Sequence, residues 1–598
     1  MSRPSPRGRL KAVAADFWQL INSPSTGRTP CHASFRPTHA GRRTLFCDFA
    51  PLRHGAALPC PGANSSPCFA VPTLNWIGKD AVVRHHKEVP FRLLEADPKL
   101  SHGDPASGNL IVEGDNLHAL KALLPRYAGR VKCACIDPPY NTGNEGWVYN
   151  DNVNAPEILR WLGHAVGKEA EDLSRHDKWL CMMYPRLVLL KQFLSDDGLI
   201  LVCLDENEIG NLRLLMDEIF GRSNCLGTIV WNTRNTDNRV KTNFSHDHEY
   251  ILVYGGGPAS SLQGRVIDRS DFKNSDDARG PYVTDPLTGK ATASERPNLH
   301  AYKMRQPGTT NVWDPDPAKG WITDEAGYLK LLANDRIWWP PNPQSGKPRK
   351  KRFLSETSTR MPAGSFWAEF KSQSGAKELD DVLGTRLFAF PKPVSVMQKL
   401  IDHCVPSDGI ILDSFAGSGT TAHAVLKQNA ADGGNRKFIL VEMEPHIARD
   451  ITAERVRRVA GGYTNAKGEK VEGLGGGFQY CRLSKEPLFD ATGAVREDVR
   501  FAQLAEFVWF AETGTGFTGK AKSPLLGVHE GVAVYLLYNG ILKDRTVDGG
   551  NVLTSPVLAM LPPHHGPKVI YAAANRLGAP RLQRERIVFK QTPYALDF

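Results

Sequence analysis

The sequence predicts an α/β fold built around a doubly wound, largely parallel sheet. Short apolar runs alternate with helix-like stretches along residues 80–232 and again along 386–460, which is the pattern of strands joined by crossover helices. Two of the apolar runs end in turns that carry chemistry, one at Asp137 and one at Asp413. Ligands of such sheets gather beyond the carboxyl ends of the strands, so both turns are candidate parts of a functional site.

The first turn follows a strand expected at 131–136 and reads Asp137-Pro138-Pro139-Tyr140. Two prolines remove two backbone donors and restrict φ, so the strand has to end there. A carboxylate and a proline carbonyl can accept both hydrogens of an amino group, and the ring of Tyr140 offers a face on which a base can stack. The plain alternative is a strand-to-loop turn in which the prolines have no chemical role.

The rest of the first half continues the alternation. A helix is expected to end near 194, a strand to cover 199–204, a helix to reach 220 and a strand to cover 228–231. Asp205 and Glu206 follow one of these strands, and we interpret them as the start of the next helix rather than as substrate contacts.

The second turn follows a strand expected at 409–412 and leads into a helix expected at 420–428. Gly417 and Gly419 permit a tight turn and a close approach of the backbone to a ligand, and the helix N-terminus favours negative charge. A Walker A loop is excluded because no lysine follows the last glycine. The next strand, 437–442, ends at Glu442, where Rossmann-like sites hold ribose hydroxyls; Glu444 is the competing candidate.

Two helices flank this second turn. Pro-Lys-Pro at 391–393 predicts the start of a helix that reaches about 403. A helix is also expected at 445–459, and its arginines are predicted to form a solvated face: Arg449, Arg455, Arg457 and Arg458.

The middle of the chain, residues 233–385, carries the sharpest basic run of the part expected to fold. It consists of Lys347, Arg349, Lys350, Lys351 and Arg352, with Trp338 and Trp339 nearby. The run is either a phosphate-contacting stretch with base-stacking aromatics or a solvated loop beside core tryptophans. His246-Asp247-His248-Glu249 has metal-binding residue types, but no further cluster supports it, and we expect no metal.

Composition separates residues 1–70 from the rest. They hold nine basic and two acidic residues and four of the eleven cysteines, so they account for +7 of the net charge of +10. Three interpretations fit: disorder, a transit peptide, or an over-extended gene whose true start is Val71. The remaining net charge of +3 is poor support for nucleic-acid binding. The sequence contains no run of eighteen apolar residues, so it predicts no membrane span. The number of cysteines is odd and no Cys-x-x-Cys pair occurs, which predicts a reduced, cytoplasmic protein.

Taken together, the two turns and their order resemble the β-group amino-methyltransferases of DNA, most closely the modification subunits of type III restriction systems. The resemblance extends to Gly114-Asp115-Asn116 before the first turn and to Pro391-Lys392-Pro393. It implies a Rossmann-like, S-adenosylmethionine-dependent methyltransferase sheet in circularly permuted order. It also implies five regions: a leader (1–70), a catalytic half (71–232), an inserted target-recognition region (233–385), a cofactor-binding half (386–460) and a C-terminal α/β extension (461–598).

The resemblance also implies roles for individual residues. The catalytic residues would be Asp137, Pro138, Pro139 and Tyr140. The cofactor would be held by Asp413, Phe415, Gly417, Ser418, Gly419, Thr420, Glu442 and Lys392. Asp115 would line the substrate pocket, and the N-cap of a helix at 117–124 is its equal alternative. Lys350, Lys351 and Arg352 are candidate DNA contacts because of the basic run itself, not because of the resemblance.

The expected activity is methyl transfer to adenine N6 in a short sequence of double-stranded DNA, after the base is flipped out of the helix. The alternatives are cytosine N4 as the target, an RNA or protein amino-methyltransferase, and a recognition subunit without catalysis. The expected partners are a helicase-nuclease restriction subunit and a second copy of the chain.

Overall fold

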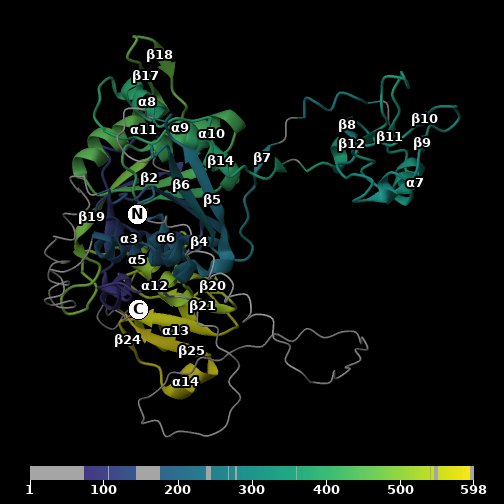
Figure 1. Cartoon of the computed structure of the whole chain (residues 1–598). Coiled ribbons are helices and arrows are strands. Elements are labelled where there is room, and N and C mark those ends of the chain that lie inside the picture. The colour runs from purple at the N-terminus through teal and green to yellow at the C-terminus, as the bar shows by residue number, and fades with distance from the viewer. Residues whose placement is uncertain are drawn as a thin grey trace, which may run out of the picture. The chain divides into compact units, whose positions relative to one another are not determined.

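A computed structural model describes residues 73–104, 107–142, 175–236, 244–266, 269–275, 279–358, 360–538, 540–543 and 550–592. The expected leader therefore lies outside the described residues. The centre of the fold is a ten-stranded sheet of order β1-β19-β2-β16-β15-β3-β4-β6-β5-β14 (Figure 1). Its strands are β1 Arg92–Ala96, β2 Leu110–Glu113, β3 Val131–Ile136, β4 Leu194–Leu204, β5 Cys225–Asn232, β6 His248–Gly255, β14 Phe366–Trp367, β15 Ile410–Asp413, β16 Lys437–Glu442 and β19 Gln479–Pro487.

The order of the strands in the sheet is not their order in the chain. Strand β15 comes late in the sequence but lies between β16 and β3, parallel to both. Asp137 and Asp413, 276 residues apart in sequence, thus follow or end neighbouring strands at the same edge of the sheet. The Rossmann-like sheet in circularly permuted order is confirmed.

Strand β6 runs antiparallel to both of its neighbours, β4 and β5. Its first residues, His248 and Glu249, consequently lie at the edge where the parallel strands end. An antiparallel strand thus brings its beginning, not its end, to the candidate site.

Helices cover both faces of the sheet (Figure 1). One face packs against α3 Asn116–Tyr127, α5 Arg175–Phe193 and α6 Ile209–Met216. The other packs against α8 Gln373–Leu383, α9 Val394–Cys404, α10 Thr420–Asp432, the π-helix η8 Ile447–Ala453 and α11 Glu454–Gly461. Side chains of β3 alternate between the two layers, since Cys133 and Cys135 join the second core while Ala134 and Ile136 join the first.

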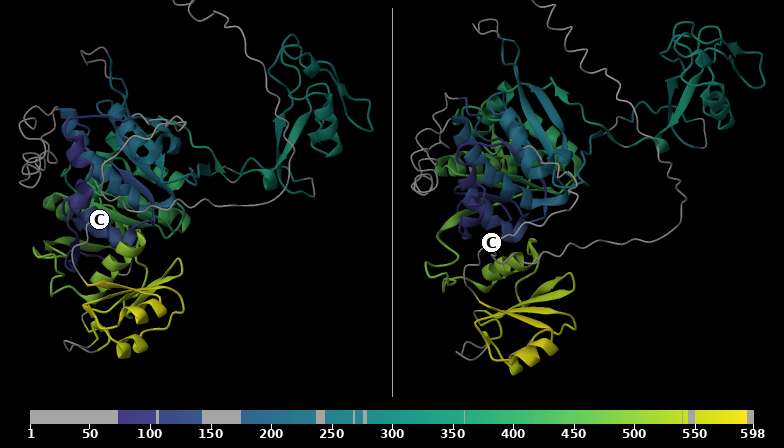
Figure 2. Two further views of the ribbon diagram at one scale, coloured as in Figure 1. Left: turned by 90° about the horizontal axis from the view of Figure 1, so that it is seen from below. Right: turned by 60° about the horizontal axis from the view of Figure 1, so that its bottom comes forward.

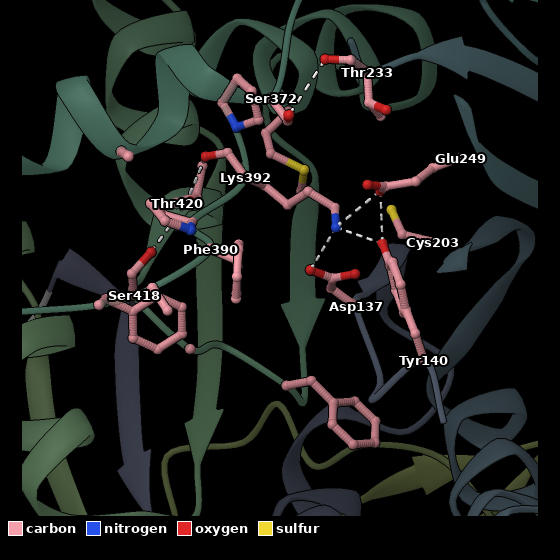
Figure 3. A pocket seen from close by; sticks show the side chains of 18 of the residues that line it. Asp137, Tyr140, Cys203, Thr233, Glu249, Ser372, Phe390, Lys392, Ser418 and Thr420 are labelled. Atoms are coloured by element: carbon pink, nitrogen blue, oxygen red, sulfur yellow. Dashed lines mark hydrogen bonds and ion pairs between the residues drawn. The ribbon is translucent and has the colours of Figure 1, made fainter. Parts of the chain in front are cut away.

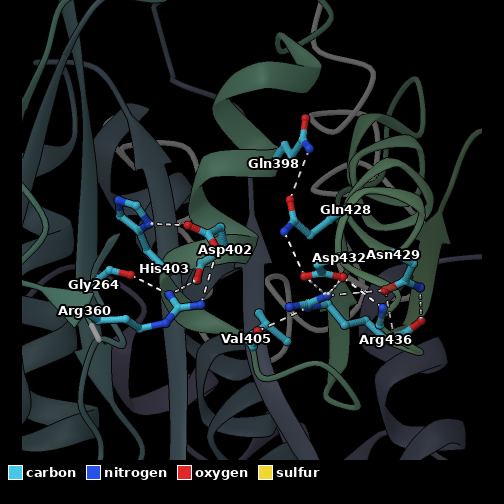
Figure 4. A network of polar contacts seen from close by, with 11 residues as sticks. Gly264, Arg360, Gln398, Asp402, His403, Val405, Gln428, Asn429, Asp432 and Arg436 are labelled. Atoms are coloured by element: carbon cyan, nitrogen blue, oxygen red, sulfur yellow. Dashed lines mark hydrogen bonds and ion pairs between the residues drawn. The ribbon is translucent and has the colours of Figure 1, made fainter. Parts of the chain in front are cut away.

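The expected recognition region, 233–385, divides into two parts. Strands β6 and β14 and helix α8 belong to the central fold. Between them, β7 Arg265–Val266 and β13 Arg360–Met361 form an antiparallel pair, which we call the neck. The guanidinium of Arg360 donates to the carbonyls of Gly264 at 2.6 Å and Asp402 at 2.9 Å, which ties the neck to α9 (Figure 4).

Beyond the neck the chain forms a small structure with a core of its own. It contains a three-stranded antiparallel sheet, β11-β12-β8, a two-stranded sheet, β9-β10, and helix α7. The bounds are β8 Tyr282–Pro286, β9 Met304–Arg305, β10 Val312–Trp313, α7 Glu325–Ala333, β11 Ile337–Trp338 and β12 Arg349–Phe353. Leu287, Tyr302, Met304, Trp313, Trp321, Tyr328 and Ile337 form its buried cluster.

The C-terminal residues form a second α/β structure, drawn in yellow-green to yellow in Figure 2. Its four-stranded sheet has the order β20-β21-β23-β25, and it carries three helices. The bounds are α12 Phe501–Thr513, β20 Leu525–His529, β21 Val532–Leu536, α13 Ser555–Met560, β23 Lys568–Ala572, α14 Ala579–Arg584 and β25 Ile587–Gln591. Strand β19 lies beyond the expected boundary at residue 460 but belongs to the central sheet.

Two global expectations concern membranes and cysteines. Within the described ranges, no helix has both the length and the apolarity needed to cross a bilayer. The cysteines described are free, and Cys133, Cys135 and Cys203 are buried in strands of the central sheet, as predicted.

Candidate active site

A cavity of about 1390 Å³ lies at the edge of the sheet where β3 and β15 end. It is lined by both sequence turns, Asp137–Tyr140 and Asp413–Thr421, and by the Phe388–Pro393 segment (Figure 3). Pockets for one small molecule usually measure roughly 300–1,000 Å³. The cavity therefore has room for a nucleoside-sized cofactor and a base together.

Hydrogen bonds from two buried side chains, Trp179 and Asn141, fix the Asp137–Tyr140 loop. The indole N–H of Trp179, on α5, donates to the carbonyl of Pro139 at 2.8 Å. Asn141 follows the loop with φ of 62° and donates to the carboxylate of Glu208, which is fully buried at the start of α6. Because the Pro139 carbonyl is engaged, Pro138 is the proline whose carbonyl we expect to face a ligand amine.

A cluster of four charged or polar groups occupies one end of the cavity. The ammonium of Lys392 lies 2.9 Å from Asp137 Oδ2 and 3.2 Å from Glu249 Oε2, and it donates to the hydroxyl of Tyr140 (Figure 3). The Tyr140 hydroxyl donates in turn to Glu249 at 2.8 Å. We call Asp137, Tyr140, Glu249 and Lys392 the carboxylate cluster.

Electrostatics within the cluster follow from burial. Burial raises the pKa of Asp137, with the neighbouring Glu249 adding to the rise, while Lys392 opposes it. Burial by itself would lower the pKa of Lys392, but the two carboxylates outweigh it and raise that pKa. The cluster thus places one ammonium between two carboxyl groups.

Glu249 was not predicted as a site residue. The sequence showed it only as the last residue of a segment considered, and rejected, as a metal site. Among the described residues, no group of three or more metal-binding side chains occurs. An acid just before an apolar strand was the available signal, but only the antiparallel direction of β6 brings it beside Asp137.

The glycine-rich turn surrounds the carboxylate of Asp413. The backbone N–H of Phe415 donates to one oxygen at 3.0 Å and the Thr421 hydroxyl donates to the other. Gly417 has φ of 49°, and a Cβ there would lie 3.2 Å from the ring of Phe388. A side chain at this position would be strained and would crowd the cavity wall, so the turn needs glycine.

Glu442 ends β16 and also faces the turn. Its oxygens accept from the backbone N–H groups of Gly417 at 2.8 Å and Glu444 at 3.0 Å. Burial raises the pKa of both Asp413 and Glu442 to about 7. Each carboxylate retains further lone pairs, and both line the cavity, as does Glu444.

Arg455 contacts the glycine-rich turn, and its position contradicts an expectation from the sequence. It was predicted on a solvated face, but it is fully buried, and its Nη1 donates to the hydroxyls of Ser418 and Thr420, both at 2.9 Å. Arg449 is likewise engaged, in an ion pair with Glu113. Of the four arginines, Arg455 supports the turn, whereas Arg457 and Arg458 pair with Glu454 on α11.

These residues fit the expected cofactor, S-adenosylmethionine. Asp413 offers a carboxylate for the ammonium of the methionine part, and the hydroxyl of Ser418 with the start of α10 at Thr420 suits its carboxylate. Glu442 is placed to accept from ribose hydroxyls. Phe415 and Gly417 line the wall between them, whereas Gly419 is not among the described residues that line the cavity and lies against Thr452.

Asp115 has the helix N-cap position that was the equal alternative to its substrate contact, and the cofactor contact expected of Lys392 remains a prediction. Asp115 is the N-cap of α3, accepts from the backbone N–H groups of Leu117 and His118, and pairs with Arg186 at 3.3 Å. It is not among the described residues that line the cavity. The side chain of Lys392 lies in the carboxylate cluster, and its carbonyl accepts from the Thr420 hydroxyl at 3.1 Å.

Apart from Lys347, the basic run lies on strand β12 rather than in a loop. Lys351 is 8% exposed and pairs with Asp335 at 3.1 Å, while Arg352 pairs with Asp285 at 2.8 Å. Burial gives Lys351 a structural place in its small sheet. Phosphate contact remains a prediction for Lys350 and Arg352.

Comparison with known proteins agrees with this site. A family model described as DNA methylase matches residues 131–454. The Mod subunit of the type III restriction-modification enzyme StyLTI of Salmonella typhimurium is 32% identical over 421 residues, 65% of this chain and 62% of the relative. The Mod subunit of EcoPI from Escherichia phage P1 is 32% identical over 422 residues, 63% and 64% of the two chains.

A type II methyltransferase shows a similar likeness. M.KpnI of Klebsiella pneumoniae is 31% identical over 402 residues, which are 62% of this chain and 92% of the relative. The chain thus spans less than two thirds of the two Mod subunits but nearly all of the type II enzyme.

Proposed function

The chain belongs to the N6/N4 DNA methylase family, and from this membership we propose that it transfers a methyl group from S-adenosylmethionine to the exocyclic amine of a base in DNA. The observation that carries the proposal is the single cavity in which Asp137–Tyr140 and the glycine-rich turn meet. One turn supplies acceptors for an amine, and the other supplies groups that suit the cofactor.

The chemistry assigned to the residues of the chain is mainly positioning. An exocyclic amine is a poor nucleophile because its lone pair is delocalised into the ring. If Asp137 and the Pro138 carbonyl accept its two hydrogens, the amine is oriented and its lone pair is directed towards the methyl donor. The ring of Tyr140 would stack on the base.

The cofactor contributes an electrophilic methyl group on a sulfonium centre. Asp413, Ser418, Thr420 and Glu442 would hold its amino acid and ribose parts, while Phe415 and Gly417 line the cavity wall. A base inside a duplex cannot reach this cavity, so the target has to be flipped out.

For the target base we propose adenine N6. An Asp at the head of the Pro-Pro-Tyr motif favours adenine, and several relatives are named as type III Mod subunits. The alternative within the family is cytosine N4. We further propose a restriction subunit as a partner, because the relatives' names identify them as subunits of restriction-modification enzymes. A helicase-nuclease activity of that partner and a second copy of the chain remain predictions from the sequence resemblance.

Expression of the chain and its Asp137→Ala variant in a host free of adenine methylation tests this function. Sequencing of the host DNA for modified bases should find N6-methyladenine at one short motif with the native chain and none with the variant. N4-methylcytosine would retain the mechanism but overturn the target base.

If neither the native chain nor the variant modifies DNA, a second measurement has to separate failure of cofactor binding from failure of methyl transfer. Calorimetry with S-adenosylhomocysteine should show binding by both, because Asp137 contacts the amine and not the cofactor site. A native protein that binds the cofactor but modifies no DNA would contradict the proposed substrate. One that does not bind the cofactor would contradict the proposed activity itself.

A further inference from the structure

Lys392 lies where the target amine is expected to bind. Its ammonium is 2.9 Å from Asp137 Oδ2, and the side chain is only 14% exposed (Figure 3). The other oxygen of Asp137, Oδ1, is enclosed by protein and has no hydrogen-bond partner among the described residues. The oxygen that remains for a ligand is therefore the one that Lys392 contacts.

The groups that face Lys392 come from three elements of the sheet. Asp137 and Tyr140 follow β3, Cys203 lies on β4 and Glu249 begins β6. Both carboxylates contact the same ammonium, and the Tyr140 ring centroid lies 4.8 Å from it. If Lys392 lost its contact with Asp137, Glu249 and Tyr140 would still compensate its charge.

The backbone of Lys392 is fixed more firmly than its side chain. Prolines precede and follow it, and its carbonyl accepts from Thr420 at the start of α10. The long side chain has three further rotatable bonds beyond χ1. A small rotation would therefore shift the ammonium from Asp137 towards Glu249 while the wall of the cofactor site stays in place.

We propose that Lys392 is a positioning residue that holds Asp137 as a carboxylate and yields the cavity-facing oxygen to the target amine, with Glu249 retaining the ammonium. The inference rests on the proposed function and adds two residues, Lys392 and Glu249, to the machinery for target binding. It differs from the cofactor contact that the sequence resemblance implied for Lys392.

The pH dependence of methyl transfer tests the first half of this proposal. Without a cation beside it, Asp137 should remain protonated to higher pH, so Lys392→Gln should move the acid limb of kcat/KM upward by about one to three pH units. Lys392→Arg keeps the charge and should leave the limb in place. Lys399→Gln is the matched control, because Lys399 also pairs with a carboxylate, Glu369, and lies over a ring, that of Trp367, but does not line the cavity.

Glu249→Gln tests the second half. With one carboxylate removed, Lys392 would bind Asp137 alone, and the target amine would have to displace its full ion pair. We expect a fall of about tenfold or more in kcat/KM for DNA, with unchanged affinity for S-adenosylhomocysteine and no upward shift of the acid limb. A wild-type kcat/KM for DNA in Glu249→Gln would overturn the proposal that Glu249 retains the Lys392 ammonium when the target amine binds.

A DNA-free measurement separates this inference from the proposed function. In Lys392→Gln, the raised pKa of Asp137 should destabilise the fold progressively as pH rises towards that pKa, so the melting temperature should recover in Lys392→Gln/Asp137→Asn. This outcome would support the inference even if no DNA substrate were found. Weaker binding of S-adenosylhomocysteine to Lys392→Gln, with an unchanged pH profile, would instead make Lys392 a cofactor residue and overturn the inference.

Discussion

Asp413 should make cofactor binding sensitive to pH. Burial raises the pKa of Asp413 to about 7, so below pH 7 the carboxyl that should pair with the cofactor's ammonium is mostly neutral. Affinity for S-adenosylhomocysteine is expected to fall about tenfold from pH 8 to pH 6. Calorimetry across this range measures the slope.

The stability of the ligand-free protein should depend on pH with the opposite sign to the affinity for the ligand. A raised folded-state pKa stabilises the protein at low pH, and that stabilisation is lost as pH rises through about 7.

The Asp413→Asn variant should bind S-adenosylhomocysteine weakly at every pH, and its affinity should change little between pH 8 and pH 6. Glu444→Gln, on the cavity wall but outside the proposed ammonium site, should keep the wild-type slope, and a flat wild-type curve would contradict the assignment of Asp413.

Single residues differ in how far the sequence could identify them. Asp137 and Asp413 were predicted because each follows or ends a recognisable strand and stands in a distinctive motif. Glu249 was missed because its position depends on the direction of β6 in the sheet. The sequence could not show that Lys351 is paired and buried, because its partner Asp335 and its place on β12 are set by strand pairing that local composition does not reveal.

At the scale of elements, helix α5 positions the Asp137–Tyr140 loop through one hydrogen bond. Trp179→Phe removes the donor to the Pro139 carbonyl while keeping most of the buried ring. A net loss of about 1 kcal/mol should lower kcat/KM for DNA about three- to tenfold, without a matching change in affinity for S-adenosylhomocysteine. Steady-state kinetics and calorimetry together measure this split.

Trp367→Phe provides the control for that change. Trp367 is also buried and donates to a carbonyl, that of Gly364, at the same distance of 2.8 Å, but Gly364, unlike Pro139, does not line the cavity. It should lose similar stability and retain kcat/KM. Equal kinetic losses in both variants would mean that Trp179 acts only through overall stability.

Most elements of the central sheet were predictable because their patterns are local. Strand β3 has the expected bounds, and α10 begins at the expected Thr420. The helix expected at 445–459 is present, but it starts as a π-helix, η8. Periodicity placed Arg455 on the helix without showing which face it occupies, since the turn that it supports comes 35 residues earlier, at Thr420.

At the scale of the whole molecule, sheet order could not be obtained from local patterns. Nothing between Asp137 and Asp413 indicates that β15 inserts beside β3; only the resemblance to a permuted family implied it. The same limit applies to the middle region, where composition showed one stretch of 233–385. In the structure, β6, β14 and α8 belong to the central fold, and the separate part lies beyond the neck.

The neck should allow the part of the chain beyond it to be removed. Val266 pairs with Arg360, and neighbouring strands lie about 5 Å apart, so a short Gly-Ser linker can replace residues 267–359. Because the part beyond the neck has its own core and Arg360 ties the neck to α9, the shortened protein should fold and bind S-adenosylhomocysteine within about threefold of wild type. It should no longer methylate the recognised motif in the sequencing assay, whereas continued methylation of that motif would place target recognition elsewhere in the chain.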